Sequence, residues 1–93
     1  MHIIQTPRFL EELEDILDYI ASDSIAYSIK FQDELEDKIQ TIEFFPYKYR
    51  KSTKSKDDNV RDLIFNGYVI PYLINIAKDK IEIGIFSENE WNA

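Results

Sequence analysis

Cationic and aromatic side chains alternate in one short part of this sequence. Residues 47–51 read Tyr-Lys-Tyr-Arg-Lys, and the stretch 47–61 carries six basic and two acidic residues. The net charge of this stretch is +4, whereas the residues before it carry −8 and those after it −3. Aromatic rings among cations suit a contact with a protein or a nucleic acid. The stretch is therefore either an anion- or partner-binding patch or a loop whose charges are only solvated.

Further candidates for binding a partner lie outside this alternating run. Arg61 could face an acidic group of a partner, or it could form a structural ion pair with a helix carboxylate. Tyr68 and Tyr72 are an even number of residues apart, so on a strand they share one face, as part of the core or as the wall of a groove. Trp91 would cover the core or anchor in a partner, and Tyr47 is expected to pack under the preceding helix. The candidate binding residues are Tyr49, Arg50, Lys51, Arg61, Tyr68, Tyr72 and Trp91.

The composition offers little support for other chemistry. The chain has no cysteine and one histidine, His2, so we expect no metal site. Two isolated glycines, Gly67 and Gly84, do not make a phosphate-binding loop, and no serine has an evident histidine base. A net charge of −7 argues against direct binding of nucleic acid, which needs a positive surface. We therefore expect no catalytic residue, no metal and no cofactor.

Length and hydropathy predict one cytoplasmic domain spanning residues 1–93. Hydrophobic residues make up 44% of the chain and aromatic residues 14%, which is enough for a packed core. No apolar run approaches the roughly 18 residues of a membrane span. The first residues also lack the basic region and long apolar stretch of a signal peptide.

The first half of the chain predicts a strand and two helices. Residues 2–5 are partly β-branched and suit a strand, and Thr6-Pro7 is typical of a helix start. Apolar residues then recur at helical spacing to about Ala21. A second helix should begin at residues 22–24 and end before Pro46, because proline disfavours helix in the residue before it. The two apolar stripes are Phe9, Leu13, Ile16, Leu17 and Ile20, then Tyr27, Phe31, Leu35, Ile39 and Ile42.

The second half predicts an antiparallel meander. Residues 60–65 form one strand, Asn66-Gly67 is typical of a type I′ turn, and residues 68–76 form the return strand. A turn at residues 78–80 leads to a last strand over residues 81–86.

Two segments complicate the meander. Pro71 cannot donate a ladder hydrogen bond, so the middle strand should be bulged there or should face an unpaired edge. Residues 51–59 are polar and lysine-rich and predict an exposed, mobile loop. The element order predicts an α+β fold of two layers, with the N-terminal strand and a helical hairpin packed on the antiparallel meander.

In this order and length, the segments resemble the RelE/ParE superfamily of toxins from type II toxin–antitoxin systems. The resemblance covers nearly the whole chain and is nearest to ParE-like plasmid-stabilisation proteins. The segments that carry it are residues 9–21, 42–46 and 60–72, including Pro46, Arg61-x-Leu63 and Tyr68-x-Ile70-x-Tyr72. It implies a toxin that is neutralised by a cognate antitoxin protein.

The two branches of this superfamily imply different actions. The RelE branch cuts mRNA on the ribosome, whereas the ParE branch poisons DNA gyrase by protein contact. RelE-like nucleases place lysine or arginine on the meander strands, but here Asp62 and Val69 stand at such positions, and residues 87–91 contain no Arg, His or Tyr. An acidic residue would repel the phosphate. The resemblance therefore favours a non-enzymatic inhibitor of DNA gyrase over an mRNA interferase or an inactive interaction module.

Overall fold

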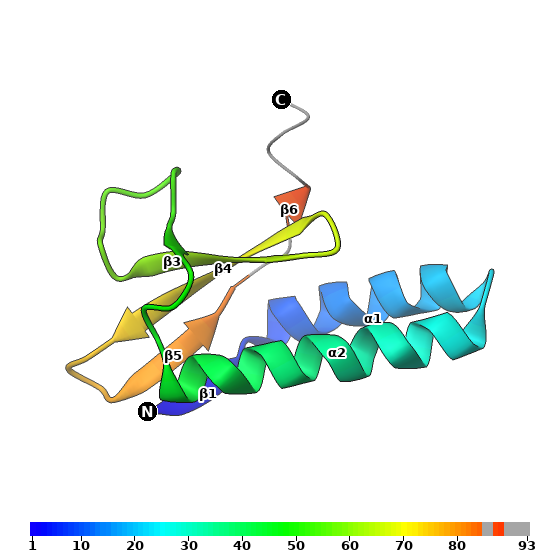
Figure 1. The fold of residues 1–93 in the computed structure, drawn as a ribbon, viewed down its shortest axis with the longest axis horizontal. Helices are drawn as coiled ribbons and strands as arrows, with labels where there is room; N and C mark the ends of the chain where they lie inside the picture. Colours follow the sequence, from blue (N-terminus) through cyan, green and yellow to red (C-terminus); the bar gives the residue numbers. More distant parts are fainter. Residues whose placement is uncertain (85–86, 89–93) are drawn as a thin grey trace.

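In the computed structural model, which describes residues 1–84 and 87–88, two antiparallel helices cover one face of a mixed β-sheet (Figure 1). The helices are α1 (Pro7–Ala21) and α2 (Ile25–Phe44). The strands are β1 (His2–Gln5), β2 (Arg50–Lys51), β3 (Val60–Phe65), β4 (Tyr68–Asn75), β5 (Lys80–Ile83) and β6 (Ser87–Glu88). The predicted α+β fold of two layers is confirmed.

Local sequence signals account for the helix boundaries. The Thr6 hydroxyl accepts a hydrogen bond from the Phe9 amide at 3.2 Å, and Pro7 takes the first helical position. The Ser24 hydroxyl caps α2 by accepting from the Tyr27 amide at 3.1 Å. Between the helices, the Ser28 hydroxyl donates to the Leu17 carbonyl at 2.9 Å, which satisfies a buried polar group at the helix contact.

The sheet follows the order β1-β5-β4-β3-β2, and β6 pairs with β4. The meander β3-β4-β5 is antiparallel as predicted, and positive φ angles at Asn66 (48°) and Gly67 (86°) form the tight turn between β3 and β4. The first strand, β1, pairs in parallel with β5, so the whole sheet is mixed.

Pro71 lies where the neighbours of β4 change. Its carbonyl accepts from the Gly84 amide at 2.7 Å, so the polar groups of Pro71 face the β5 side and not β3. The register of β4 with β5 ends at Tyr72, and the pairing with β6 begins at Val69. Pro71, which has no amide proton, therefore lies between the part of β4 that pairs with β5 and the part that pairs with β6. Glycine permits the close approach, because a Cβ at Gly84 would lie 3.0 Å from the Pro71 oxygen.

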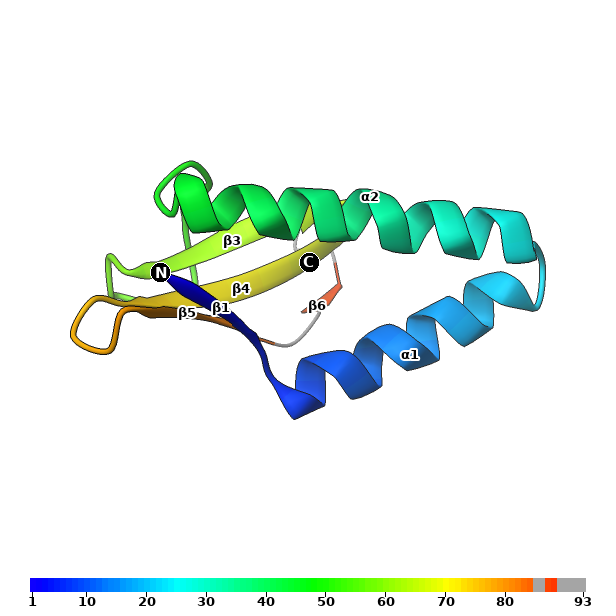
Figure 2. The same ribbon diagram turned by 90° about the horizontal axis from the view of Figure 1, so that it is seen from below.

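A single core lies between the helices and the sheet. Its buried members are Phe9, Leu13, Phe31, Leu35, Ile39, Ile42, Leu63, Phe65, Ile70, Tyr72, Ile74, Ile81 and Ile83. The helical hairpin projects beyond the sheet (Figures 1 and 2). Tyr27, near the start of α2, is therefore 49% exposed, and its prediction as a core residue was wrong. Tyr19, Ile25 and Ile29 are exposed near the same tip.

Candidate functional site

The predicted binding residues fall into separate groups. Tyr49, Lys51, Arg61 and Tyr72 lie together, where the register pairs Lys51 with Arg61 and Arg61 with Tyr72. Tyr68 lies at the other end of β4, against Phe31, with 6.1 Å between ring centroids. The remaining two, Arg50 and Trp91, belong to neither group: Arg50 points to the opposite sheet face, and Trp91 lies outside the described residues.

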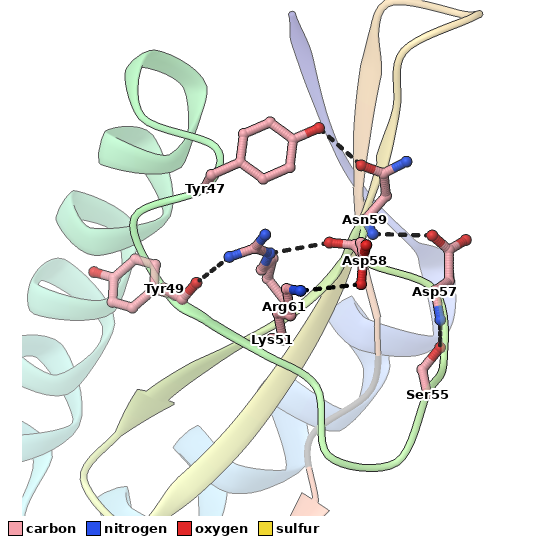
Figure 3. Close-up of polar contacts among 8 residues, drawn as sticks. All are labelled: Tyr47, Tyr49, Lys51, Ser55, Asp57, Asp58, Asn59 and Arg61. Carbon is pink, nitrogen blue, oxygen red and sulfur yellow. Dashed lines mark hydrogen bonds and ion pairs between the residues drawn. The ribbon is translucent and has the colours of Figure 1, made fainter.

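Arg61 is held beneath the end of α2 by a ring and by backbone carbonyls (Figure 3). Its guanidinium carbon lies 4.8 Å from the centroid of the Tyr47 ring. Its Nε donates to the Asp58 carbonyl at 3.1 Å, and its Nη1 donates to the Tyr49 carbonyl at 3.2 Å. Within residues 1–84 no helix carboxylate forms a salt bridge with Arg61, so the alternative of a helix ion pair was wrong.

Tyr47 does not pack under α2 as predicted. Its side chain is 47% exposed, and its hydroxyl donates to Asn59 Oδ1 at 2.7 Å (Figure 3). Its ring instead stacks against Arg61 and faces the loop. Cation–π contacts of this kind contribute about 0.5–1 kcal/mol at exposed sites. Tyr47 therefore joins the loop to β3 and leaves part of its ring open to a partner.

The predicted loop is shorter than expected, because Arg50–Lys51 form strand β2. The remaining residues 52–59 close back on the sheet, where the Ser52 amide donates to the Val60 carbonyl at 2.9 Å. Side chains cap the turns: the Asp57 amide donates to Ser55 Oγ at 3.1 Å, and the Asn59 amide donates to Asp57 Oδ1 at 2.9 Å (Figure 3). The exposed Lys51 and Asp58 side chains lie 3.2 Å apart.

Arg50 and Asp62 face each other on the sheet face opposite the helices. Their register pairs them directly across β2 and β3, with 3.5 Å from Arg50 Nη2 to Asp62 Oδ2. The Asp62 side chain is 4% exposed and that of Arg50 is 31% exposed. Because burial of a lone carboxylate would be costly, the arginine is its required counter-charge.

The other lysine on this face is also paired. Lys80 and Glu82 lie on the same side of β5, with 2.9 Å between Nζ and Oε1. Across the neighbouring strands, Lys80 lies beside His2 and Asn75, and Glu82 lies beside Ile4 and Leu73. In β1 to β5 the one arginine and the one lysine of this face, Arg50 and Lys80, therefore lie against a carboxylate, which reduces the positive field that a phosphate would meet.

A comparison with known protein families finds a match along nearly the whole chain. A family model described as the ParE toxin of the type II toxin–antitoxin system parDE matches residues 3–87. The chain belongs to the ParE toxin family. It is thus the toxin component of a type II toxin–antitoxin system, and its partner is an antitoxin. No curated protein matches the chain.

Two tyrosines of this ParE-family toxin stabilise the fold. Tyr72 is 1% exposed, its hydroxyl donates to the Pro46 carbonyl at 2.6 Å, and its ring meets the Tyr49 ring edge-on at 6.5 Å. Burial raises the pKa of the Tyr72 hydroxyl from 10.0 to about 12. Tyr68 packs on the core beside Phe31. Both side chains are consistent with the predicted core position.

Tyr72→Phe should lower the free energy of unfolding by about 1–2 kcal/mol, because it leaves the Pro46 carbonyl without its donor.

The pH dependence of the free energy of unfolding should also differ between wild type and Tyr72→Phe. The folded pKa lies above the unfolded one, so the contribution of the neutral hydroxyl is complete below pH 10 and is lost toward pH 12, by about 1.4 kcal/mol per pH unit. Urea unfolding at about pH 8 and pH 11 should show the two proteins converging. Tyr19→Phe, at a residue that is 79% exposed, is the control. Equal pH slopes for wild type and Tyr72→Phe would contradict this assignment.

The exposed aromatic residues at the end of α2 were not predicted from the sequence. Phe44 is 74% exposed and Phe45 is 65% exposed. A signal for Phe44 was present, since it lies two residues from Ile42 and therefore on the opposite side of the helix from the buried stripe. Phe45 follows as the C-cap residue, where the chain leaves the helix.

The described part of this toxin has neither a cluster of metal ligands nor a helix that could span a membrane. Among residues 1–84 and 87–88, no three His, Cys, Asp or Glu side chains lie close enough to hold a metal ion. Neither α1 nor α2 combines the length and the apolar character needed to cross a bilayer.

Proposed function

We propose that this ParE-family toxin acts by binding a protein target, DNA gyrase, and that its antitoxin blocks this binding. The observation that carries the proposal is the Asp62 carboxylate, which is buried and paired with Arg50 on the face of the meander opposite the helices. Cleavage of RNA requires cations that hold the charge developing on the phosphate. On this face Arg50 and Lys80 are already paired with carboxylates, so contact between proteins is the better supported means of action.

The arrangement of exposed side chains also supports a role in protein recognition. Large apolar side chains remain exposed at both ends of α2, including Ile25 and Ile29 at one end and Phe44 and Phe45 at the other. Exposed apolar side chains that lie close together, as Ile25 and Ile29 do one turn apart on α2, are typical of a protein–protein interface. A toxin with two partners, its antitoxin and its target, needs such surface.

Induced expression without the antitoxin gene tests the proposal. Inhibition of gyrase predicts filamentous cells and DNA damage while protein synthesis continues. Early loss of translation with cleaved mRNA would contradict the proposal in favour of a ribonuclease, and normal growth with soluble toxin present would contradict it in favour of an inactive interaction module. The core variant Phe31→Ala should weaken any effect only as far as it lowers the amount of folded toxin in the cell, which is measured alongside.

A further inference from the structure

The tip of the helical hairpin, which projects beyond the sheet (Figure 2), carries apolar side chains that the fold leaves uncovered. Tyr19 is 79% exposed, Ile25 is 69% exposed and Ile29 is 58% exposed. A hollow of about 370 Å³ lies at this tip, lined by Tyr19, Ile20, Ser22, Asp23 and Tyr27. The charged side chains of residues 15–29 are all acidic and exposed, namely Asp15, Asp18 and Asp23. The tip is therefore both apolar and negative.

The other end of α2 has the opposite charge. A shallow hollow of about 540 Å³ is lined there by Phe45, Pro46, Tyr47 and Lys48. Phe45 and Tyr47 are 65% and 47% exposed. Lys48 is exposed, and among the described residues no carboxylate forms a salt bridge with it. Residues 47–61 together carry +4, so this end is both apolar and positive.

These two surfaces cannot meet within one molecule. The 20 residues of α2 hold them about 30 Å apart, at a rise of about 1.5 Å per residue. Between two copies of the chain, a contact of tip with tip would bring Asp18 and Asp23 against the same acids of the other copy. A contact of hollow with hollow would bring Lys48 against Lys48. Like charges disfavour both of these arrangements, whereas tip against hollow pairs opposite charges and covers apolar surface on both copies.

We propose that this toxin binds a second copy of itself, with the hairpin tip of one copy in the hollow at the end of α2 of the other. Apolar tip side chains such as Ile25 contact Phe45 and Tyr47. The carboxylate of Asp23 meets the Lys48 ammonium group. Because the two surfaces differ, each pair keeps one free tip and one free hollow, so the contact continues into chains of molecules. This association goes beyond the proposed function and does not depend on gyrase being the target.

Sedimentation of the purified full chain over a range of concentrations tests the proposal. The contact is small, so it should be weak, with a dissociation constant of about 0.1–1 mM. The mean mass should therefore rise above that of a single chain as the protein concentration approaches about 1 mM. Added salt should lower the mean mass, because the paired charges are exposed. A mean mass that stays at one chain throughout this range would overturn the proposal.

Charge reversal tests the ionic part of the contact. Asp23→Lys and Lys48→Glu should each weaken self-association about tenfold, because each change brings like charges together. The chain that carries both changes should associate as wild type, and an equal mixture of the two single variants should regain most of the association, because both restore opposite charges. Lys38→Glu makes a charge change at an exposed position of α2 between the two surfaces, and it should associate as wild type.

Replacement of exposed apolar side chains tests the other part of the contact. Ile25→Ser and Phe45→Ser should each weaken self-association about five- to tenfold. Their equal mixture offers one intact tip and one intact hollow, so it should form pairs but no chains. Leu10→Ser, at a residue that is 48% exposed near the other end of α1, is the control and should associate as wild type. These positions are exposed, so no change should unfold the domain, which circular dichroism checks.

Three further results would overturn the proposal. Unchanged association of Asp23→Lys would show that the tip is outside the contact, and unchanged association of Phe45→Ser would show the same of the hollow. If the doubly reversed chain did not regain association, the tip and the hollow would not meet each other. No gyrase enters these measurements, so failure here is distinct from failure of the proposed function.

Discussion

Asp62→Ala should lower the free energy of unfolding by about 3 kcal/mol, because it leaves the Arg50 guanidinium beside a cavity and without this carboxylate. The value is at the low end for a broken buried pair, since Arg50 keeps 31% of its side chain exposed. Replacement of both residues by apolar ones, Arg50→Met with Asp62→Leu, should recover most of the loss. Denaturant unfolding of the two variants and wild type provides the measurement.

A matched control distinguishes this buried pair from a surface one. Asp58→Ala removes the partner of Lys51, where both side chains are more than half exposed, and should cost less than about 1 kcal/mol. If Asp62→Ala were as mild as Asp58→Ala, the carboxylate would not be structural. The Asp62–Arg50 pair would then no longer support the proposed action by protein binding.

Phe31→Ala should have the largest effect on stability, lowering the free energy of unfolding by about 4 kcal/mol. Phe31 is 2% exposed and meets the Phe65 ring edge-on, with 5.0 Å between centroids. It also contacts Tyr68, so the change removes aromatic contacts between α2 and two strands in addition to leaving a cavity. A domain of this size has about 5–15 kcal/mol of stability in total, so the loss is a large fraction of it.

Phe44→Ala is the matched control on the same helix. Phe44 is 74% exposed, so its loss should change the free energy of unfolding by less than about 0.5 kcal/mol. Thermal unfolding by circular dichroism would record both variants under one condition. Equal midpoints for Phe31→Ala and Phe44→Ala would contradict the position of the core described above.

Features with a local cause could be predicted from the sequence. The helix starts at Pro7 and Ile25 follow from Thr6 and Ser24 as capping residues, and the turn at Asn66-Gly67 follows from the need for positive φ. The core stripe of α2 was correct from Phe31 onward, where the helix lies over the sheet. The predicted stripe was wrong at Tyr27, because the spacing of apolar residues along a helix does not reveal where the sheet beneath that helix ends.

Features that depend on distant pairing could not be predicted in the same way. The parallel pairing of His2 with Lys80 joins the two ends of the domain, and no local pattern encodes it. The two-residue strand β2 forms only because β3 offers its edge to Arg50 and Lys51. This pairing sets Arg50 opposite Asp62, so the predicted contact residue became half of a buried pair.

The site was predicted least well because the residues between elements lack periodicity. Residues 47–61 could be identified from the sequence as the positive region. The way in which Arg61 is held could not be predicted. Its partners are two carbonyls and a ring, and composition gives no indication of backbone acceptors. The exposed Phe45 was assigned only as a helix end. Phe45, Pro46, Tyr47 and Lys48 line a shallow hollow at the end of α2, which could be recognised only in three dimensions.

Supercoiling of relaxed plasmid by purified DNA gyrase, titrated with the purified full chain, tests the central claim most directly. We expect that supercoiling falls as the folded toxin is added and that heat-unfolded toxin is without effect. Undiminished supercoiling with the folded toxin in large excess over gyrase would contradict the account.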